Sequence, residues 1–391
     1  MQIRGNNALH KVDRYMGIPL VALLSVLRRK RKLPSKIQKI GLLKAGAIGD
    51  TVLLTGPIAD LCAEFPGTEL VLFAGESNYE MAHLLDGIAQ VVRVPSGNPL
   101  RGIAAMRSVK VDVLLDFGQW SRLEALYAAF ARASYTLGFR TANQYRHSVY
   151  DRSVEHSANQ HELENYRDLI RALGVKTQHP PSLKSPLDGQ PDTTVAPYVV
   201  CHPWAGGRRR ELKQWPAEEW SRLITEISEW GLHAVLTGGP ADHHQNEKII
   251  SNLPAYSRVT TSNAAGLSLK RSTEILAGAR LTVSVNTGVM HLAAALGVPV
   301  VGLQGPTSSK RWGPIGKNTI AIDSTSALCG YLNLGWEYPA DPPPCMETVS
   351  YDAVRDACKL LCDGYSSDLS AARPVEAILL ETNVRSTWRL K

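Results

Sequence analysis

The sequence predicts an α/β protein made of two Rossmann-like, doubly wound domains in tandem. Short apolar runs alternate with turns and amphipathic segments along most of the chain, and a stretch without periodicity divides this pattern into two similar series. Such alternation is typical of βαβ units and therefore of parallel sheets. At 391 residues the chain is long enough for two domains of ordinary size.

The N-terminal segment, residues 1–37, combines an apolar stretch with a cluster of cations. Residues 16–27 are apolar, with Pro19 near their start, and are too few to cross a bilayer, which takes about 20. Residues 28–39 contain seven Lys or Arg and no acid. We expect a helix in the membrane interface beside a polybasic patch that contacts an anionic membrane surface. The alternative is a helix packed on the protein's own core with a solvated basic tail.

The net charge of +7 comes almost entirely from this block. Nucleic-acid-binding proteins usually spread their basic residues over a folded face, so no nucleic-acid partner is expected.

The first domain is expected over 38–180. Strands are predicted at 40–44, 70–73 and 111–115, with a turn at 45–50 and a helix at 51–65. A linker follows at 181–196, within a stretch rich in Pro, Gly, Ser and Thr.

The second domain is expected over 197–365. Strands are predicted at 198–201, 233–236 and 279–284, and a helix at 216–230. A C-terminal tail, 366–391, remains, and packing back on the first domain is one option for it. Ligands of such sheets bind at the carboxyl ends of the strands, so the default site is a cleft between the two domains.

In the first domain, one loop after a strand carries chemistry. Asp50 ends the loop Gly46-Ala-Ile-Gly49-Asp50 and is either a helix N-cap or a carboxylate that accepts a proton. The spacing G-x-x-G-D is not that of a dinucleotide fingerprint, which weighs against an NAD-dependent oxidoreductase.

In the second domain, two loops offer ligand contacts. The loop from His202 through Trp204 to Lys213 holds four cations within residues 208–213, which suits a diphosphate, although a solvated basic loop is the alternative. Thr237 and Asp242 lie in the next loop, where Asp242 either binds sugar or ribose hydroxyls or caps a helix.

A further loop of the second domain, Asn286-Thr287-Gly288, begins a short Ala-rich helix that carries His291. Either Asn286 or Thr287 is expected to cap this helix. Its N–H groups and the positive end of its dipole suit a phosphate.

The six cysteines are sparse, which argues against a secreted disulfide scaffold. Cys358 with Cys362, and Cys329 with Cys345, allow a zinc site, but no C-x-x-C pair supports one. Buried or incidental thiols are the simpler interpretation.

Together these motifs resemble glycosyltransferase family 9, the heptosyltransferases, from about residue 38 to 362. The matching motifs are Ile48-Gly49-Asp50, Gly138-Phe139-Arg140, His161 with Asn165 and Leu173-Gly174, His202-Pro-Trp-Ala, Lys213-Gln-Trp-Pro, Gly238-Gly-Pro, Asn263 to Gly266, and Asn286-Thr287-Gly288 with His291.

The resemblance implies a GT-B fold, with two Rossmann-like domains facing a central cleft, acceptor domain first. It implies an inverting, metal-independent glycosyltransferase that needs no cofactor and moves a heptose or related sugar from a nucleotide-diphosphate donor to a lipid-linked glycan acceptor, as in lipopolysaccharide biosynthesis. It places the protein in the cytoplasm, peripheral on the inner face of the cytoplasmic membrane.

By this resemblance Asp50 is the general base. Acceptor-binding residues are then Gly49, Arg140, His161 and Asn165, and donor-binding residues are Lys213, Thr237, Asp242, Asn286, Thr287, Gly288, His291 and Trp204. Asn286 stands where the family usually has Asp, and Trp204 where it has Gly. These departures leave the donor sugar open and permit a non-catalytic sugar-nucleotide or glycolipid-binding protein as an alternative.

Overall fold

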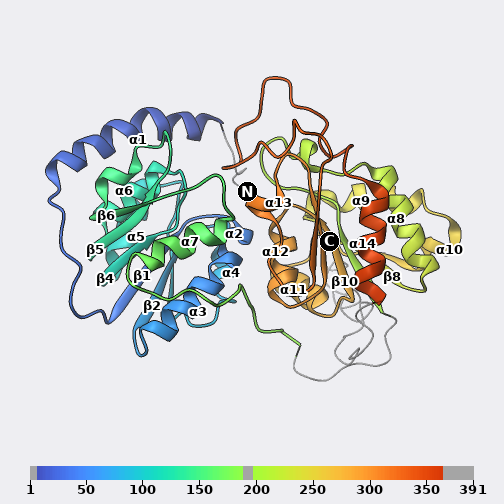
Figure 1. Ribbon diagram of the computed structural model, residues 1–391, viewed down its shortest axis with the longest axis horizontal. Helices are drawn as coiled ribbons and strands as arrows, with labels where there is room; N and C mark the ends of the chain where they lie inside the picture. The colour runs from blue at the N-terminus through green and yellow to red at the C-terminus, as the bar shows by residue number, and fades with distance from the viewer. Residues whose placement is uncertain (1–6, 188–196, 364–391) are drawn as a thin grey trace, which may run out of the picture. The chain divides into compact units, whose positions relative to one another are not determined.

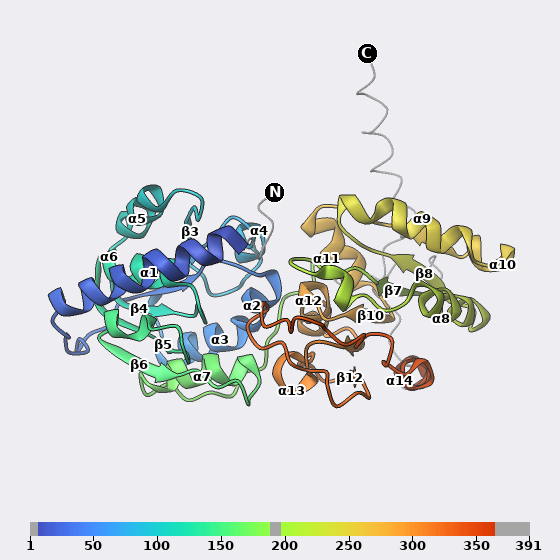
Figure 2. The same cartoon turned by 90° about the horizontal axis from the view of Figure 1, so that it is seen from above.

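The computed structural model describes residues 7–187 and 197–363. The described residues divide into two compact units. The first ends at Leu183 and also includes Asn333–Glu337, and the second takes the remaining described residues. Figures 1 and 2 show both units. The expected tail at 366–391, and residues 188–196 of the expected linker, lie outside the described residues.

The first unit contains a six-stranded sheet in the order β3-β2-β1-β4-β5-β6. All its strand pairs are parallel. The strands are β1 (Lys39–Lys44), β2 (Glu69–Ala74), β3 (Gln90–Arg93), β4 (Val111–Asp116), β5 (Ala133–Arg140) and β6 (Arg152–Glu155). The helices are α1 (Asn7–Leu27), α2 (Ile48–Leu53), α3 (Thr55–Glu64), α4 (Tyr79–Ala82), α5 (Pro99–Ser108), α6 (Arg122–Phe130), the 3-10 turn η1 (Arg146–Val149) and α7 (Glu162–Arg171).

The second unit repeats this architecture in the order β12-β11-β10-β7-β8-β9, again with parallel pairs. The strands are β7 (Tyr198–His202), β8 (His233–Leu236), β9 (Thr261–Asn263), β10 (Leu281–Val285), β11 (Val300–Gln304) and β12 (Thr319–Asp323). The helices are η2 (Arg210–Lys213), α8 (Ala217–Glu229), η3 (Pro240–Asp242), α9 (His243–Ser251), α10 (Ala255–Arg258), α11 (Leu269–Ala277), α12 (Gly288–Ala295), α13 (Ser309–Trp312) and α14 (Tyr351–Asp363).

Both strand orders correspond to 3-2-1-4-5-6, the order typical of doubly wound sheets. The predicted α/β class with two Rossmann-like sheets is therefore confirmed, and each predicted strand matches an observed one to within two residues. The apolar runs form the central strands because those strands are buried on both faces: in β1, every residue from Ile40 to Lys44 is buried. The cleft expected between the domains stays a prediction.

The core of each unit lies between its sheet and the covering helices. In the first unit α5 and α6 share one apolar cluster with the sheet, and α1 adds Val21 to it. In the second, α8 and α14 share a cluster around Trp220 and Val354 with the sheet.

The N-terminal helix is longer than the apolar stretch that predicted it. It runs over Asn7–Leu27 with Pro19 inside it, and it packs along α6 and η1 (Figures 1 and 2). An interior Pro costs a free helix about 3 kcal/mol, so this tertiary packing is what sustains the helix through it. No helix among the described residues is both long and apolar enough to span a bilayer.

Candidate active site

In the first unit, the strand order reverses between β1 and β4. Asp50 follows β1 on α2, and Gln119 follows β4, so both belong to loops at the carboxyl edge of neighbouring strands. Ligands of doubly wound sheets bind at this switch point. Its residues are therefore the first candidates for chemistry in this unit.

Asp50 is not the N-cap that one reading of the sequence proposed. The sequence predicted a helix from Thr51, whereas α2 begins three residues earlier and covers Ile48–Leu53. Ala47 occupies its N-cap position, with a φ of 68°. Asp50 therefore lies in the first turn, where a carboxylate is favoured by the helix dipole. Gly75 lies close against the start of this loop and must lack a side chain, because a Cβ there would lie 2.0 Å from the Ala45 carbonyl oxygen.

The Asp50 carboxylate is surrounded by polar side chains. Its Oδ1 lies 2.9 Å from Lys44 Nζ, accepts a 2.6 Å hydrogen bond from Gln119 Nε2, and accepts one of 3.2 Å from the Tyr166 hydroxyl. Lys44 Nζ also donates to Gln119 Oε1 over 2.9 Å. All four residues are buried. Asp50 is thus a buried carboxylate held in one orientation beside an ammonium group.

Helix α7 contributes a second carboxylate to this group. Glu162 Oε1 accepts a 2.8 Å hydrogen bond from Gln119 Nε2, and Glu162 Oε2 lies 3.0 Å from His156 Nε2. Glu162 is fully buried. The network therefore joins Lys44, Asp50, Gln119, Tyr166, Glu162 and His156, which we call the Asp50 network.

His161 and Asn165, predicted to bind the acceptor, fix α7 in place. His161 is the N-cap of α7, and its Nδ1 accepts a 3.1 Å hydrogen bond from the Leu163 amide. Asn165 bonds to both backbone groups of Ser157 and donates to Glu162 Oε2 over 3.3 Å. Both residues thus orient the helix that carries Glu162 and Tyr166.

The other predicted acceptor residues lie differently. Gly49 is buried within α2 next to Asp50. Arg140 ends β5, and its exposed side chain pairs with Glu155 on β6 at 3.1 Å. Their roles stay predictions.

Sequence reasoning missed Lys44, Gln119, Glu162, Tyr166 and His156. One signal was available: Lys44 is a cation at the end of an otherwise apolar, buried strand. Charged side chains are rarely buried unless they are paired, so its partner could have been sought in the loop that follows. The contacts from α7 had no local signal, because Tyr166 lies 116 positions from Asp50 in the chain.

A second buried network lies at the end of β4. Asp116 Oδ2 accepts hydrogen bonds from Arg146 Nη2 at 2.5 Å and from the Tyr150 hydroxyl at 2.6 Å. Glu124 on α6 lies nearby, and burial together with the Asp116 carboxylate raises the pKa of Glu124 to about 7. Gly138 is required here, because a Cβ would lie 2.5 Å from the Tyr150 ring.

In the second unit, the corresponding switch point lies between β7 and β10, where His202 and Ser284 are register partners. The loop Asn286-Thr287-Gly288 follows β10 and leads into α12. Thr287 occupies the N-cap position without a side-chain capping bond. Asn286 precedes the N-cap position, and its Nδ2 donates to Gln304 Oε1 at 2.6 Å and to the Trp312 carbonyl at 3.0 Å. The expected side-chain cap is therefore wrong, and the N–H groups that begin α12 are available to an anion in its place.

Two histidines lie near this switch point, and both are buried. His291 is on α12. His202 Nδ1 lies 2.9 Å from the Thr237 hydroxyl, and burial lowers the pKa of His202 to about 4. His202 is therefore neutral at pH 7 and adds no positive charge for a phosphate. The Thr237 hydroxyl is hydrogen-bonded to this histidine.

The remaining predicted donor residues are held within their own loops. Lys213 Nζ donates to the Gly206 carbonyl at 2.7 Å. Asp242 Oδ2 accepts from the Gly239 amide at 2.8 Å, and its Oδ1 pairs with Arg210 at 3.2 Å. Asp242 thus closes the turn before α9 and has an arginine beside it. It occupies the N-cap position of α9 but makes no side-chain capping bond there, so the capping alternative is met in position only. The indole N–H of Trp204 donates to Asn246 Oδ1 at 2.6 Å.

Two cysteines that were expected to be thiols form a disulfide. Cys329 and Cys345 are bridged, closing a loop that contains Asn333–Glu337, whereas Cys62, Cys201, Cys358 and Cys362 are free. The sequence interpretation was wrong here because the loop after β12 returns on itself, which spacing alone does not reveal. Within the described ranges, no group of three or more His, Cys, Asp or Glu side chains could hold a metal ion.

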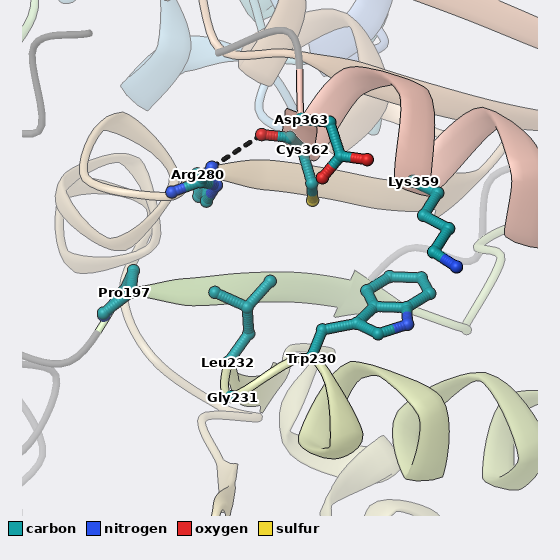
Figure 3. Close-up of a pocket in the computed structure, with 8 residues that line it drawn as sticks. All are labelled: Pro197, Trp230, Gly231, Leu232, Arg280, Lys359, Cys362 and Asp363. Atoms are coloured by element: carbon teal, nitrogen blue, oxygen red, sulfur yellow. Dashed lines mark hydrogen bonds between the residues drawn. The ribbon is translucent and has the colours of Figure 1, made fainter. Parts of the chain in front are cut away.

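A cavity of about 340 Å³ lies elsewhere in the second unit. Figure 3 shows it between Trp230 and Leu232 on one side and Lys359 and Cys362 on the other, with Arg280 Nη2 donating to the Cys362 carbonyl at 2.6 Å. Its walls include Pro197 and Leu232, which precede β7 and β8. This cavity is thus at the amino edge of the sheet, opposite the edge where doubly wound sheets bind ligands.

Comparison with known proteins identifies the relatives. The chain is 28% identical over 220 residues to lipopolysaccharide heptosyltransferase 1 of Escherichia coli K12, covering 55% of this chain and 67% of that protein. It is 30% identical over 185 residues to the Salmonella typhimurium enzyme of the same name, covering 45% and 54%. The aligned region thus spans about two thirds or less of these relatives.

Solved structures share the fold. E. coli ADP-heptose lps heptosyltransferase II superposes with a TM-score of 0.69 at 19% identity, covering 84% of this chain and 100% of that one. E. coli heptosyltransferase WaaC with ADP gives 0.66 at 21% identity, covering 83% and 99%. Residues 102–329, more than half of the chain, match glycosyltransferase family 9 (heptosyltransferase), and the chain belongs to that family.

Proposed function

We propose that the protein is an inverting, metal-independent glycosyltransferase. Its donor is a nucleotide-diphosphate sugar carrying a heptose or a related sugar, and its acceptor is a hydroxyl of a lipid-linked glycan, as in lipopolysaccharide biosynthesis. Family membership supports the transfer, and the named relatives are heptosyltransferases of lipopolysaccharide. The absence of any Asp-x-Asp pair in the sequence favours stabilisation of the diphosphate by cations and a helix start.

The observation that carries this proposal is the buried Asp50 at the switch point of the first sheet. In the proposed step, the acceptor oxygen attacks the anomeric carbon while Asp50 takes the hydroxyl proton. The bond to the diphosphate oxygen breaks, and the nucleoside diphosphate leaves from the opposite face, which inverts the configuration. Gln119 and Tyr166 hold the carboxylate through the hydrogen bonds at 2.6 and 3.2 Å, so it needs little reorganisation.

The second unit would bind the donor. The first N–H groups of α12 face the carboxyl edge of the sheet and favour the diphosphate, whose charge grows as the bond breaks. Lys213 lies on η2 after β7, the neighbouring strand, and supplies a cation from the second loop of that switch point. Asp242, with Arg210 beside it, would contact the sugar portion of the donor.

A lipid-linked acceptor places the protein at a bilayer. We therefore assign it to the cytoplasm, peripheral on the inner face of the cytoplasmic membrane, with an anionic membrane surface as a partner. No cofactor or nucleic acid enters this proposal.

Replacing Asp50 by Asn tests the base. We expect transfer to fall about a hundredfold or more, with donor binding nearly unchanged, because the amide keeps the shape of the side chain and loses its basicity. Asp60→Asn is the control: Asp60 is also buried, pairs with His179 at 2.7 Å, and lies on α3 without being a member of the Asp50 network. Transfer by Asp50→Asn at the wild-type rate would refute the role of Asp50.

Ligand-binding measurements distinguish the proposed transferase from a non-catalytic binding protein and from an oxidoreductase. A thermal-shift series of nucleoside diphosphates, their sugars and NAD measures which ligand stabilises the fold by mass action. A sugar nucleotide that binds without any transfer to glycolipid acceptors would favour the non-catalytic binding protein. Tighter binding of NAD would favour an oxidoreductase.

A further inference from the structure

Helix α1 has two chemically different sides. One side packs against α6 and η1 of the first unit. The other carries apolar side chains that this unit leaves exposed. A surface helix of a globular protein normally exposes polar residues, so the exposed side of α1 needs a separate explanation.

The packed side is held by specific contacts. Asp13 accepts hydrogen bonds from the Arg122 and Leu123 amides at 3.0 and 2.9 Å, and pairs with the Arg122 guanidinium at 3.0 Å. Gly17 allows close approach, since a Cβ there would lie 2.7 Å from Arg122 Cβ. Val21 is buried in the apolar cluster of the unit. The orientation of the helix is therefore set by residues 13, 17 and 21.

The exposed side forms a continuous apolar stripe. Apart from the adjacent pair Tyr15 and Met16, its residues recur at spacings of three and four, which places them on one face of the helix. They are Val12, Tyr15, Met16, Leu20, Leu23 and Val26, with exposed fractions between 44% for Leu20 and 84% for Val26. No charged residue interrupts the stripe. We call it the α1 stripe.

Cations border this stripe at its C-terminal end. Three of the seven basic residues in 28–39 are engaged: Arg28 and Arg31 pair with Asp151 at 3.5 and 2.8 Å, and Lys39 pairs with Glu69 at 2.6 Å. The other four are exposed and lie two to nine positions beyond the end of the helix; they are Arg29, Lys30, Lys32 and Lys36. The structure thus divides the block into cations that fasten the segment to the unit and cations that face solvent.

Exposed apolar side chains beside exposed cations indicate which kind of partner binds the α1 stripe. A second copy of the stripe carries the same four cations, so it supplies no opposite charge to them. A bilayer with anionic lipids satisfies both features, because acyl chains take the apolar side chains and head groups attract the cations. Tyr15 suits the boundary between these layers, since its ring is apolar and its hydroxyl is polar.

We propose that the α1 stripe, with the exposed cations at 29, 30, 32 and 36, is a membrane-docking surface for anionic bilayers. The helix lies in the plane of the interface with its other side packed on the protein. The inference rests on the proposed function in one respect, because a lipid-linked acceptor requires the protein to work at a bilayer.

Flotation with vesicles of phosphatidylcholine containing phosphatidylglycerol, compared with pure phosphatidylcholine, tests the surface. We expect the full chain to float with the anionic vesicles, and Leu20→Gln/Leu23→Gln to lose about tenfold or more in partitioning. Leu100→Gln/Leu360→Gln is the matched control, since these leucines are 80% and 65% exposed elsewhere, and should float like the wild type. Lys30→Glu/Lys32→Glu should lose about tenfold or more. Circular dichroism checks that every variant is folded.

Two results would overturn the proposal. One is equal flotation of the Leu20/Leu23 variant and the wild type. The other is a wild-type dimer in solution that the Leu20/Leu23 change converts to monomer, which would make the stripe a self-interface. Flotation needs no sugar transfer, so Asp50→Asn should float normally. An inactive protein that floats refutes only the proposed function, and an active protein that does not float refutes only the docking surface.

Discussion

The Lys44 ammonium lies 2.9 Å from the Asp50 carboxylate, and both side chains are less than a tenth exposed. Lys44 ends β1 and Asp50 lies six residues later on α2, so the tight loop at Ala47 brings the pair together. A buried ion pair of this kind orients a carboxylate strongly. Removing one partner leaves a charge with no compensation, so the pair should be detectable by stability as well as by activity.

Lys44→Met should therefore lower the free energy of unfolding by about 3 kcal/mol, since Asp50 would remain buried beside an apolar side chain. Adding Asp50→Asn should recover part of this loss, and a double-mutant cycle in denaturant gives the coupling energy. Lys39→Met is the control on the same strand. Its ion pair with Glu69 is largely exposed and should cost no more than about 1 kcal/mol. Equal losses for the two variants would contradict a special role for the Lys44–Asp50 pair.

Glu124 should make stability depend on pH. Its folded pKa of about 7 lies above the ordinary value of 4.5, so the folded state keeps a proton that the unfolded state releases. The contribution of this proton to the free energy of unfolding is complete below pH 4.5 and is lost as the pH rises to 7, a loss of about 3 kcal/mol. Glu124→Gln should remove that decline in urea unfolding measured from pH 4.5 to 8. Glu164→Gln, on the surface of α7, should leave it intact; a decline that persists in Glu124→Gln would assign it elsewhere.

We expect the neutral amide of Asn286 to favour donor binding over a carboxylate at this position. Asn286→Asp replaces an N–H donor, which now meets Gln304 Oε1 and the Trp312 carbonyl, with a carboxylate that faces two acceptors. It also adds a negative charge beside a diphosphate, so we expect ADP affinity to fall about tenfold, measured by calorimetry. Asn252→Asp makes the same charge change at the end of α9 and should have little effect. Tighter ADP binding by Asn286→Asp would show that the amide is a handicap.

The disulfide should stabilise the second unit. Cys329 and Cys345 are 16 positions apart, and closing a loop of this size is worth about 3 kcal/mol in the unfolded state. Adding a reductant should lower the thermal midpoint, and Cys329→Ser/Cys345→Ser should abolish the response to reductant. Cys62→Ser, which removes an exposed free thiol, should leave the response unchanged. A wild-type midpoint that ignores reductant would show that the bridge contributes nothing.

Much of the fold follows from local patterns. Apolar runs such as 40–44 and 198–201 became central parallel strands, because a run buried on both faces leaves no other arrangement for its side chains. The motif residues Asp50 and Asn286 were found because each follows such a strand. Where side-chain hydrogen bonds decide the outcome, local reasoning failed. It gave the N-cap as one of two roles for Asp50, expected a side-chain cap on α12, and missed that Asn286 turns towards Gln304 and Trp312.

By itself, the sequence determined the α/β class, the two series of strands, and which loops follow their carboxyl ends, since these depend on hydrophobic periodicity and turn chemistry along the chain. Tertiary structure decided which side chains meet. Tyr166 reaches Asp50, Cys329 pairs with Cys345, and Asp13 fastens α1 to Arg122. These pairs form where segments distant in the sequence pack together, because a buried polar group needs a hydrogen-bond partner. The local sequence pattern does not indicate which distant residue that partner is.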